Sequence, residues 1–158
     1  MNSISNSLEA IHNAEGSYIS IATFDHSSIR FYWVDKSEVK VAVMPDINRP
    51  FAPLPRSKLF MNVVQKREDI DKVIEKIGSI VSQTQFSKNI GPGSVSGAAI
   101  YAGMQCLKGN GGRVMVFTSN SCINGFGASK PRDDRIITIP EKEKSLYIPS
   151  VSYNYILF

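Results

Sequence analysis

Apolar and polar residues follow a β-strand pattern over the first third of the chain. Residues 17–25 (SYISIATFD) are rich in residue types that favour strands, and 28–34 (SIRFYWV) alternate bulky apolar with more polar side chains. The short turn between these two segments predicts that they pair antiparallel. Residues 39–44 (VKVAVM) predict a further short strand. The next segment, 45–57 (PDINRPFAPLPRS), holds four of the eight prolines and is therefore expected to be an extended loop.

Helical spacing of apolar residues predicts three helices. Residues 4–15 show this spacing, with Gly16 as the expected stop. Residues 67–83 show it most clearly, and acidic residues in their first turn suit the positive end of the helix dipole. The apolar stripe of this helix consists of Ile70, Val73, Ile74, Ile77, Ile80 and Val81. The third helix, SVSGAAIYAGMQCLK, is rich in small residues and has Ser94 as its candidate N-cap.

The stretch 111–134 (GGRVMVFTSNSCINGFGASKPRDD) combines an apolar run with a long loop that contains several glycines. Because 114–117 (VMVF) is apolar on both faces, it predicts a buried strand in the middle of a parallel sheet. The loop that leaves such a strand lies where open α/β sheets place their working surface. Further strands are expected at 137–139 and near the C-terminus. Strands alternating with helices predict an α/β fold.

Composition and charge are those of a folded domain with a mild preference for acidic partners. Apolar residues make up 42% and charged residues 20% of the 158 residues, which fits one domain. No apolar run is long enough to span a bilayer, and the N-terminus does not resemble a secretory signal. The two cysteines offer no disulfide framework and no zinc-ligand spacing, so a reducing compartment is expected. The formal net charge of +4 favours acidic partners or an anionic membrane, and it does not indicate nucleic acid.

Residues that could carry catalysis are isolated in the sequence. His12 and His26 are expected to be solvated, and Ser119 lacks the glycine frame of a nucleophile elbow. Cys122 has no histidine at an identifiable spacing. The segment 125–130 (GFGASK) lacks the pattern of a phosphate-binding loop. We therefore expect no catalytic residue and no bound cofactor, and a small hydrolase that uses Ser119 or Cys122 is kept as a minor alternative.

An early antiparallel hairpin in a doubly wound sheet resembles the von Willebrand factor A-type domain, some members of which bind a metal ion. Metal-binding members of that family use a D-x-S-x-S motif, a threonine and an aspartate, and the motif is absent here. Ser94 would match the threonine and Ser119 the aspartate. Hydroxyl groups lack the negative charge that holds a hard divalent cation, so no metal is expected. A metal-dependent A-type adhesion module remains the alternative function.

Four stretches together resemble the trunk domain of the cargo-adaptor subunit of the COPII vesicle coat. They are ATFDHSSIRFYWV, MPDINRPFAPLP, GGRVMVFTSN and INGFGASKPRDD, and they occur in the order found in that family. The second stretch resembles a loop that pairs an acidic residue, here Asp46, with a Phe-x-Pro-Leu-Pro run, here 51–55. The fourth resembles a loop in which spaced glycines precede an arginine and an acidic residue, here Gly125, Gly127, Arg132 and Asp133. The resemblance covers roughly residues 4–147.

The resemblance implies a von Willebrand factor A-like fold: a doubly wound, mostly parallel sheet with an antiparallel edge strand, flanked by helices. Residues 1–158 would form a single, incomplete trunk domain. The first, central strand of the family would precede Met1 and is missing, so another chain would fill that gap or the sheet would be rearranged. The family's zinc ribbon, which would bind zinc in a full-length member, is also outside this sequence, and the segment after Tyr147 diverges.

The function that the resemblance implies is that of a non-catalytic scaffold and cargo adaptor. The expected partners are the GTPase-activating subunit of the inner COPII coat, cargo export signals and, peripherally, the endoplasmic reticulum membrane. The expected location is the cytoplasmic side of endoplasmic reticulum exit sites and of COPII vesicles. Lys130 and Arg132 are the candidate contacts to acidic groups of cargo or lipid, although both would also suit a solvated loop.

Overall fold

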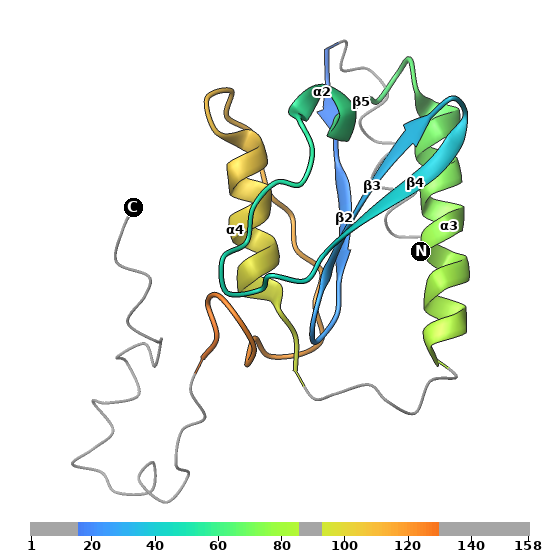
Figure 1. Ribbon diagram of the computed structural model, residues 1–158. Coiled ribbons are helices and arrows are strands. Elements are labelled where there is room, and N and C mark those ends of the chain that lie inside the picture. Colours follow the sequence, from blue (N-terminus) through green and yellow to red (C-terminus); the bar gives the residue numbers. More distant parts are fainter. Residues whose placement is uncertain (1–15, 86–92, 130–158) are drawn as a thin grey trace, which may run out of the picture. The chain divides into compact units, whose positions relative to one another are not determined.

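The computed structural model describes residues 16–85 and 93–129, which belong to two compact units. The first unit consists of 16–23, 30–44 and 52–85, and the second of 24–29, 45–51 and 93–129. Figure 1 shows the course of the chain through both. Each unit is described by itself below.

The first unit combines two small sheets with one long helix. Its strands are β1 (Tyr18–Ile19), β2 (Ile21–Phe24), β3 (Ile29–Asp35), β4 (Glu38–Met44) and β5 (Met61–Asn62). Its helices are α2 (Arg56–Leu59) and α3 (Arg67–Gln85). β2, β3 and β4 form one sheet in that order, and β1 pairs with β5 in the other.

Short connections determine the direction of the strands in the three-stranded sheet. Residues 25–28 join β2 to β3, and only Lys36 and Ser37 separate β3 from β4. Connections this short join antiparallel neighbours, since a parallel pair needs a crossover of a dozen or more residues. Lys36 and Ser37 have φ values of 48° and 66°. Positive φ at both central residues is the geometry of a two-residue hairpin turn whose twist matches that of the strands.

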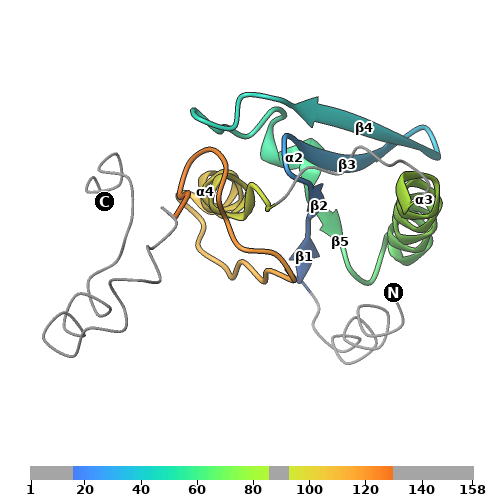
Figure 2. The same ribbon diagram turned by 90° about the horizontal axis from the view of Figure 1, so that it is seen from below.

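The core of the first unit forms where α3 packs against β4 and β5 (Figures 1 and 2). Its fully buried members are Tyr32, Met61, Ile70 and Val73, and partly buried residues from β1 to β4 and from α3 surround them. The Tyr32 hydroxyl lies 2.8 Å from Thr23 Oγ1, so the polar tip of this buried aromatic ring has a hydrogen-bond partner on the neighbouring strand.

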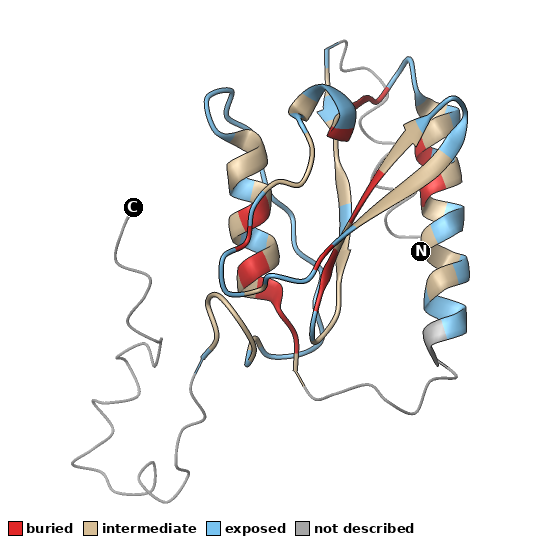
Figure 3. Ribbon diagram, viewed as in Figure 1, coloured by how far each residue is buried: buried red, intermediate tan, exposed pale blue. Residues whose placement is uncertain are grey.

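The strand and helix predictions for the first unit are largely confirmed. The segments predicted at 17–25, 28–34 and 39–44 overlap β1 to β4, and the helix predicted at 67–83 is α3, which extends to Gln85. Five of the six stripe residues of α3 lie in or against the core, whereas Val81 is 47% exposed. Figure 3 shows that buried, intermediate and exposed positions all occur along the long helix α3. The proline-rich segment 45–57 is a loop up to Pro55, where the short helix α2 begins.

The second unit contains one helix, α4 (Ser96–Leu107), and several loops. Val95 and Ala98 are fully buried, and so is Ala102 one turn further along. The prediction that Ser94 caps this helix is wrong, because Val95 occupies the N-cap position and no side chain caps it. Ser94 instead forms an isolated parallel bridge with Cys122.

The predicted buried strand at 114–117 is contradicted by the structure. These residues belong to no strand, and all four side chains are exposed. A strand needs a neighbour to take up its backbone groups, and no backbone hydrogen bond joins Val114–Phe117 to any residue that the structure describes. The fold is therefore a mixture of helices and antiparallel sheets, and the two sheets of the described residues contain no parallel pair of strands.

Several predicted elements lie outside the described residues. They are the helix at 4–15 and the strands at 137–139 and at the C-terminus, together with the loop residues Lys130 and Arg132. Within 16–85 and 93–129, no helix has the combination of length and apolar character that crossing a membrane requires.

The packing of α3 leads to a first prediction. Ile70→Ala should lower the free energy of unfolding by about 2–4 kcal/mol, because it removes a fully buried side chain and leaves a cavity. The matched control is Val81→Ala on the same helix, which removes a half-exposed side chain and should change stability by less than about 0.5 kcal/mol. Urea denaturation followed by far-ultraviolet circular dichroism measures both. Equal losses would contradict the core described here.

Candidate protein-interaction site

Three segments that are distant in the sequence meet in the second unit and are joined by backbone hydrogen bonds. The Val95 N–H donates to the Asp25 carbonyl over 3.0 Å, which joins the start of α4 to the turn before β3. The Phe126 N–H donates to the Ile47 carbonyl over 2.7 Å, which joins the loop 121–129 to the loop 45–51. The Asn124 side chain donates to the His26 carbonyl over 3.0 Å. The cluster is therefore built from loops that constrain one another.

The turn at 25–28 is closed by its own acidic residue. Asp25 Oδ1 accepts the backbone N–H groups of Ser27 and Ser28 at 2.7 and 2.8 Å. An aspartate that bonds to the backbone two and three residues on is a common way of fixing a turn. Asp25 is thus engaged in local structure, and its carbonyl is the acceptor that positions α4.

The loop 121–129 lies on the first turn of α4 at a distance that only glycine allows. A Cβ added to Gly97 would lie 2.4 Å from the Phe126 carbonyl oxygen and 2.8 Å from the Gly127 Cα. Gly127 has a φ of +80°, and a Cβ there would lie 2.9 Å from the Gly97 Cα. Both contacts are with backbone atoms, which cannot move aside as a flexible side chain could. The pair Gly97 and Gly127 therefore sets how closely loop and helix approach.

Further contacts hold this loop in place. The Ser129 N–H and hydroxyl both donate to the Cys122 carbonyl, at 2.8 and 2.9 Å, and close the loop on itself. The Phe126 ring packs against the Tyr101 ring of α4 with centroids 4.4 Å apart and planes inclined at 46°. Tilted aromatic pairs at this separation are favourable. These contacts fix the position of the loop 121–129 on α4.

The loop 45–51 presents an aromatic side chain from an ordered backbone. Asp46 Oδ1 accepts the Arg49 N–H over 3.0 Å, and the Ile47 N–H donates to the Pro45 carbonyl over 2.9 Å. Phe51 ends this segment and is 54% exposed. An exposed aromatic residue on a fixed loop is the kind of group that dominates protein–protein contacts.

The residues at the metal positions of the A-type domain are arranged for hydrogen bonding within the chain. Ser94 is buried, and its hydroxyl lies 3.2 Å from Ser96 Oγ and 3.4 Å from the carbonyl oxygens of Asn120 and Ser121. Ser119 is exposed. Residues 93–129 contain no aspartate or glutamate, and no group of three potential metal ligands occurs among the described residues.

The two cysteines occupy different surroundings. Cys122 Sγ accepts the Gly97 N–H at 3.2 Å and so belongs to the contact between loop and helix. Burial raises the pKa of the Cys106 thiol, which lowers the fraction of reactive thiolate there. His26 contributes its backbone carbonyl to the cluster, as the acceptor of Asn124.

Sequence reasoning identified part of this cluster. The spaced glycines Gly125 and Gly127 and the loop after Pro45 were singled out, and the structure brings these segments together. Gly97, Tyr101 and Asn124 were missed as contributors. The small residue at Gly97 was noted only as a feature of a close-packed helix, and nothing local signals the partners of Tyr101 or Asn124. Lys130 and Arg132, the predicted cargo contacts, lie outside the described residues.

Comparison with known families gives a match over almost the whole chain. The model of the Sec23/Sec24 trunk domain family matches residues 1–156. This chain belongs to that family. The resemblance to a coat-adaptor trunk domain, inferred above from four stretches of sequence, is thereby confirmed. No solved structure matches the chain.

Similar curated proteins are also members of this family, and the chain matches only a small part of the length of each. The chain is 28% identical over 134 residues to "Protein transport protein SEC24 C" of Arabidopsis thaliana, which covers 84% of this chain and 12% of that protein. It is 28% identical over 149 residues to "Protein transport protein sec24" of Aspergillus clavatus, with 90% and 16% covered. It is 30% identical over 118 residues to "Protein transport protein SEC24 B" of Arabidopsis thaliana, with 73% and 10% covered. The chain thus spans less than a fifth of each of these relatives.

Two glycines of α4 provide a paired test of the loop contact in this trunk domain. Gly103→Ala should raise the free energy of unfolding by about 0.5–1 kcal/mol, because alanine favours a helix interior and the new Cβ meets only Val114 at 3.5 Å. Gly97→Ala should lower it by roughly 1–3 kcal/mol, because its Cβ would overlap the backbone of the loop 121–129. Urea denaturation of both variants measures the two signs. A stabilising Gly97→Ala would show that the loop does not rest on α4.

Proposed function

We propose that this chain is a non-catalytic scaffold and cargo-adaptor module of the COPII coat. The observation that carries the proposal is the trunk-domain match over residues 1–156, with relatives whose names describe protein transport. In this proposal the chain docks on the GTPase-activating subunit of the inner coat and supports packaging of cargo between the endoplasmic reticulum and the Golgi. It acts on the cytoplasmic side of endoplasmic reticulum exit sites and of coated vesicles, through contact alone and without a cofactor. In the assembled adaptor its fold is the doubly wound, mostly parallel sheet of the family.

The arrangement of the second unit supports a role in docking. Its loops are held by backbone hydrogen bonds, and the Phe51 side chain at the end of the loop 45–51 is 54% exposed. Preorganised loops lose little conformational freedom when a partner binds, so more of the contact energy appears as affinity. The alternative of a hydrolase rested on Ser119 or Cys122. Cys122 Sγ accepts the Gly97 N–H within the loop–helix contact, which speaks against its use as a nucleophile beside a base.

Phe51→Ala tests docking on the coat subunit. We expect it to weaken binding of the purified GTPase-activating coat subunit by about tenfold, the effect of losing an exposed aromatic anchor. Biolayer interferometry with the immobilised 158-residue chain measures the affinity. Because Phe51 is half exposed, the free energy of unfolding should change little.

The matched control for this variant is Tyr18→Ala, which removes another exposed aromatic residue, from β1 in the first unit. It should leave the affinity for the coat subunit within about twofold of the parent chain. If neither variant changes the affinity, or if both reduce it alike, the loop 45–51 is not the docking element.

Lys130 and Arg132 remain the proposed contacts to acidic export signals. The double variant Lys130→Ala with Arg132→Ala should weaken binding of a synthetic peptide with two acidic residues by roughly three- to tenfold, because each lost charge pair at a surface contributes modestly. Isothermal titration calorimetry measures this, with Lys58→Ala as the control for a general loss of positive charge. An unchanged affinity in the double variant would remove the cargo role from these two residues.

A further inference from the structure

Two Asn-Gly pairs lie in the part of the chain that the structure describes, and their surroundings differ. Asn110 precedes Gly111 in the turn that follows α4, and Asn124 precedes Gly125 in the loop 121–129. An asparagine followed by glycine is prone to lose ammonia, because no side chain on the glycine hinders attack by its backbone nitrogen on the asparagine amide. Glycine also has the conformational freedom that ring closure requires. The surrounding structure therefore decides which of the two pairs reacts.

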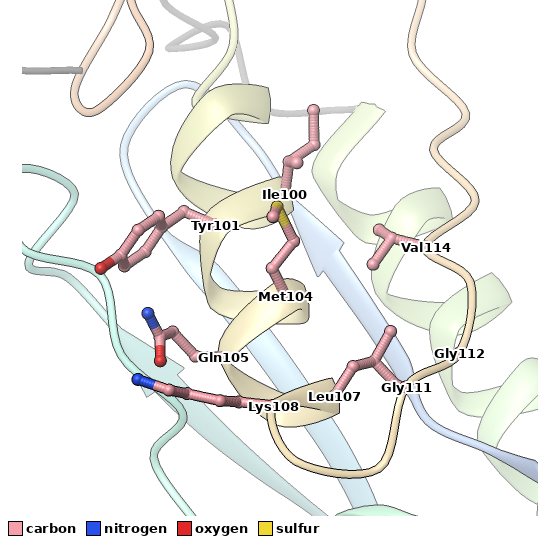
Figure 4. Close-up of a pocket in the computed structure, with 9 residues that line it drawn as sticks. All are labelled: Ile100, Tyr101, Met104, Gln105, Leu107, Lys108, Gly111, Gly112 and Val114. Carbon is pink, nitrogen blue, oxygen red and sulfur yellow. The ribbon is translucent and has the colours of Figure 1, made fainter. Parts of the chain in front are cut away.

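The pair Asn110–Gly111 is open to solvent. Both residues are exposed, as are Gly109 and Gly112 on either side. Gly111 has a φ of +73°, and a Cβ built on it would meet no atom within 4 Å outside its chain neighbours. Figure 4 shows Gly111 in the turn beyond Leu107, the last residue of α4. The five-membered ring that the reaction forms therefore has space here.

One hydrogen bond opposes the reaction at Asn110, and it lies at a helix end. The Gly111 N–H donates to the Leu107 carbonyl over 3.0 Å, and the Asn110 N–H donates to the same oxygen over 3.1 Å. Attack by the Gly111 nitrogen requires the first of these bonds to open. Hydrogen bonds at fraying helix ends open at little cost in free energy, whereas those in packed regions open only with larger parts of the structure. This bond consequently slows the reaction without preventing it.

The pair Asn124–Gly125 is held on both sides. The Asn124 side-chain amide donates to the His26 carbonyl over 3.0 Å, which fixes the group that would be attacked. A Cβ at Gly125 would lie 2.7 Å from the Ile47 carbonyl oxygen, so the backbone there is closely packed. The Phe126 N–H donates to that same oxygen over 2.7 Å. Ring formation at Asn124 therefore requires the separation of two loops, which is a larger opening than the fraying of a helix end.

From this contrast we propose that Asn110 is a site of spontaneous deamidation in the folded protein and that Asn124 is not. The Gly111 nitrogen bonds to the side-chain carbonyl carbon of Asn110, and the bond from that carbon to the amide nitrogen breaks. The proton lost by the Gly111 nitrogen leaves with the amide group as ammonia. Water then adds to either carbonyl of the succinimide and opens the ring. The product is aspartate, or isoaspartate in which the main chain runs through the former side chain.

The modification places a carboxylate at the end of a helix. Lys108 is the C-cap residue of α4, and it lines a groove together with Gly111 (Figure 4). The formal net charge of +4 falls by one, and the new negative charge lies close to the last carbonyl groups of α4, where it opposes the helix dipole. Isoaspartate also lengthens the main chain of the turn by one methylene group. Deamidation therefore loosens the end of α4 that is farther from the loop contact at Gly97.

Peptide mapping by mass spectrometry tests the proposal on the unmodified 158-residue chain. The protein is kept at mildly alkaline pH in water enriched in heavy oxygen, so that each site that reacts during the experiment takes up the label. We expect labelled aspartate and isoaspartate to form at position 110 at least about tenfold faster than at position 124. In concentrated guanidinium chloride, which removes the loop contacts, the two sites should react at rates within about threefold of each other.

Variants assign the change in charge to one residue. Cation-exchange chromatography separates a less cationic form from aged protein, and Asn110→Gln should remove most of that form, because glutamine closes the corresponding six-membered ring far more slowly. Asn110→Asp should elute with the less cationic form from the start. The matched control is Asn48→Gln at an exposed asparagine that precedes arginine, and it should leave the amount of that form unchanged.

Three results would overturn the proposal. The first is equal labelling of both positions in the folded protein, which would mean that the loops do not protect Asn124. The second is labelling of position 110 only in denaturant, which would mean that the hydrogen bond to Leu107 blocks the reaction. The third is a less cationic form that persists undiminished in Asn110→Gln. None of these measurements involves the coat subunit, so this inference and the proposed function are tested separately.

Discussion

The close approach of Gly97 and Gly127 determines the arrangement of the second unit. Because neither residue has a Cβ, the loop 121–129 can rest directly on the first turn of α4. From that position Cys122 accepts the Gly97 N–H, and the Phe126 ring reaches Tyr101. The same placement directs the Phe126 N–H at the Ile47 carbonyl, so the order of the loop 45–51 depends on it too. A larger side chain at either glycine would therefore disturb contacts well beyond the helix.

Sequence patterns predicted the helices and strands whose buried side chains recur with a fixed period. α3 was identified because its stripe recurs every three to four residues, and β3 because apolar and polar residues alternate. α2 and β5 were missed. β5 has only two residues, and its pairing of Ile19 with Met61 depends on chain that is distant in the sequence. No pattern within two residues can report such a partner.

The run at 114–117 shows what an apolar pattern leaves open. Apolar residues on both faces indicate that a segment tends to be covered, but they do not specify by what. The prediction supplied a parallel sheet as the cover. The structure instead places Val114 beside Gly103 of α4 and leaves all four side chains exposed. Both the strand and its burial were predicted wrongly, because burial depends on neighbours that the apolar run itself does not specify.

The candidate site could be predicted only in part, because its contacts also depend on residues that are distant in the sequence. The spacing of Gly125 and Gly127 signalled a loop with unusual backbone conformations, and both residues have positive φ. The partners of that loop, among them Tyr101 and the turn at His26, come from chain up to a hundred residues away, and their side chains carry no distinguishing local signal. Ser94 was misread because a serine before a helix usually caps it, whereas here the bridge to Cys122 shifts the helix start to Ser96.

The hydrogen bonds within the loop 45–51 determine how Phe51 can bind a partner. Phe51 projects from a loop whose backbone is already bonded, so a partner gains contact with little ordering of this chain. Rigid aromatic docking favours a folded partner of fixed shape.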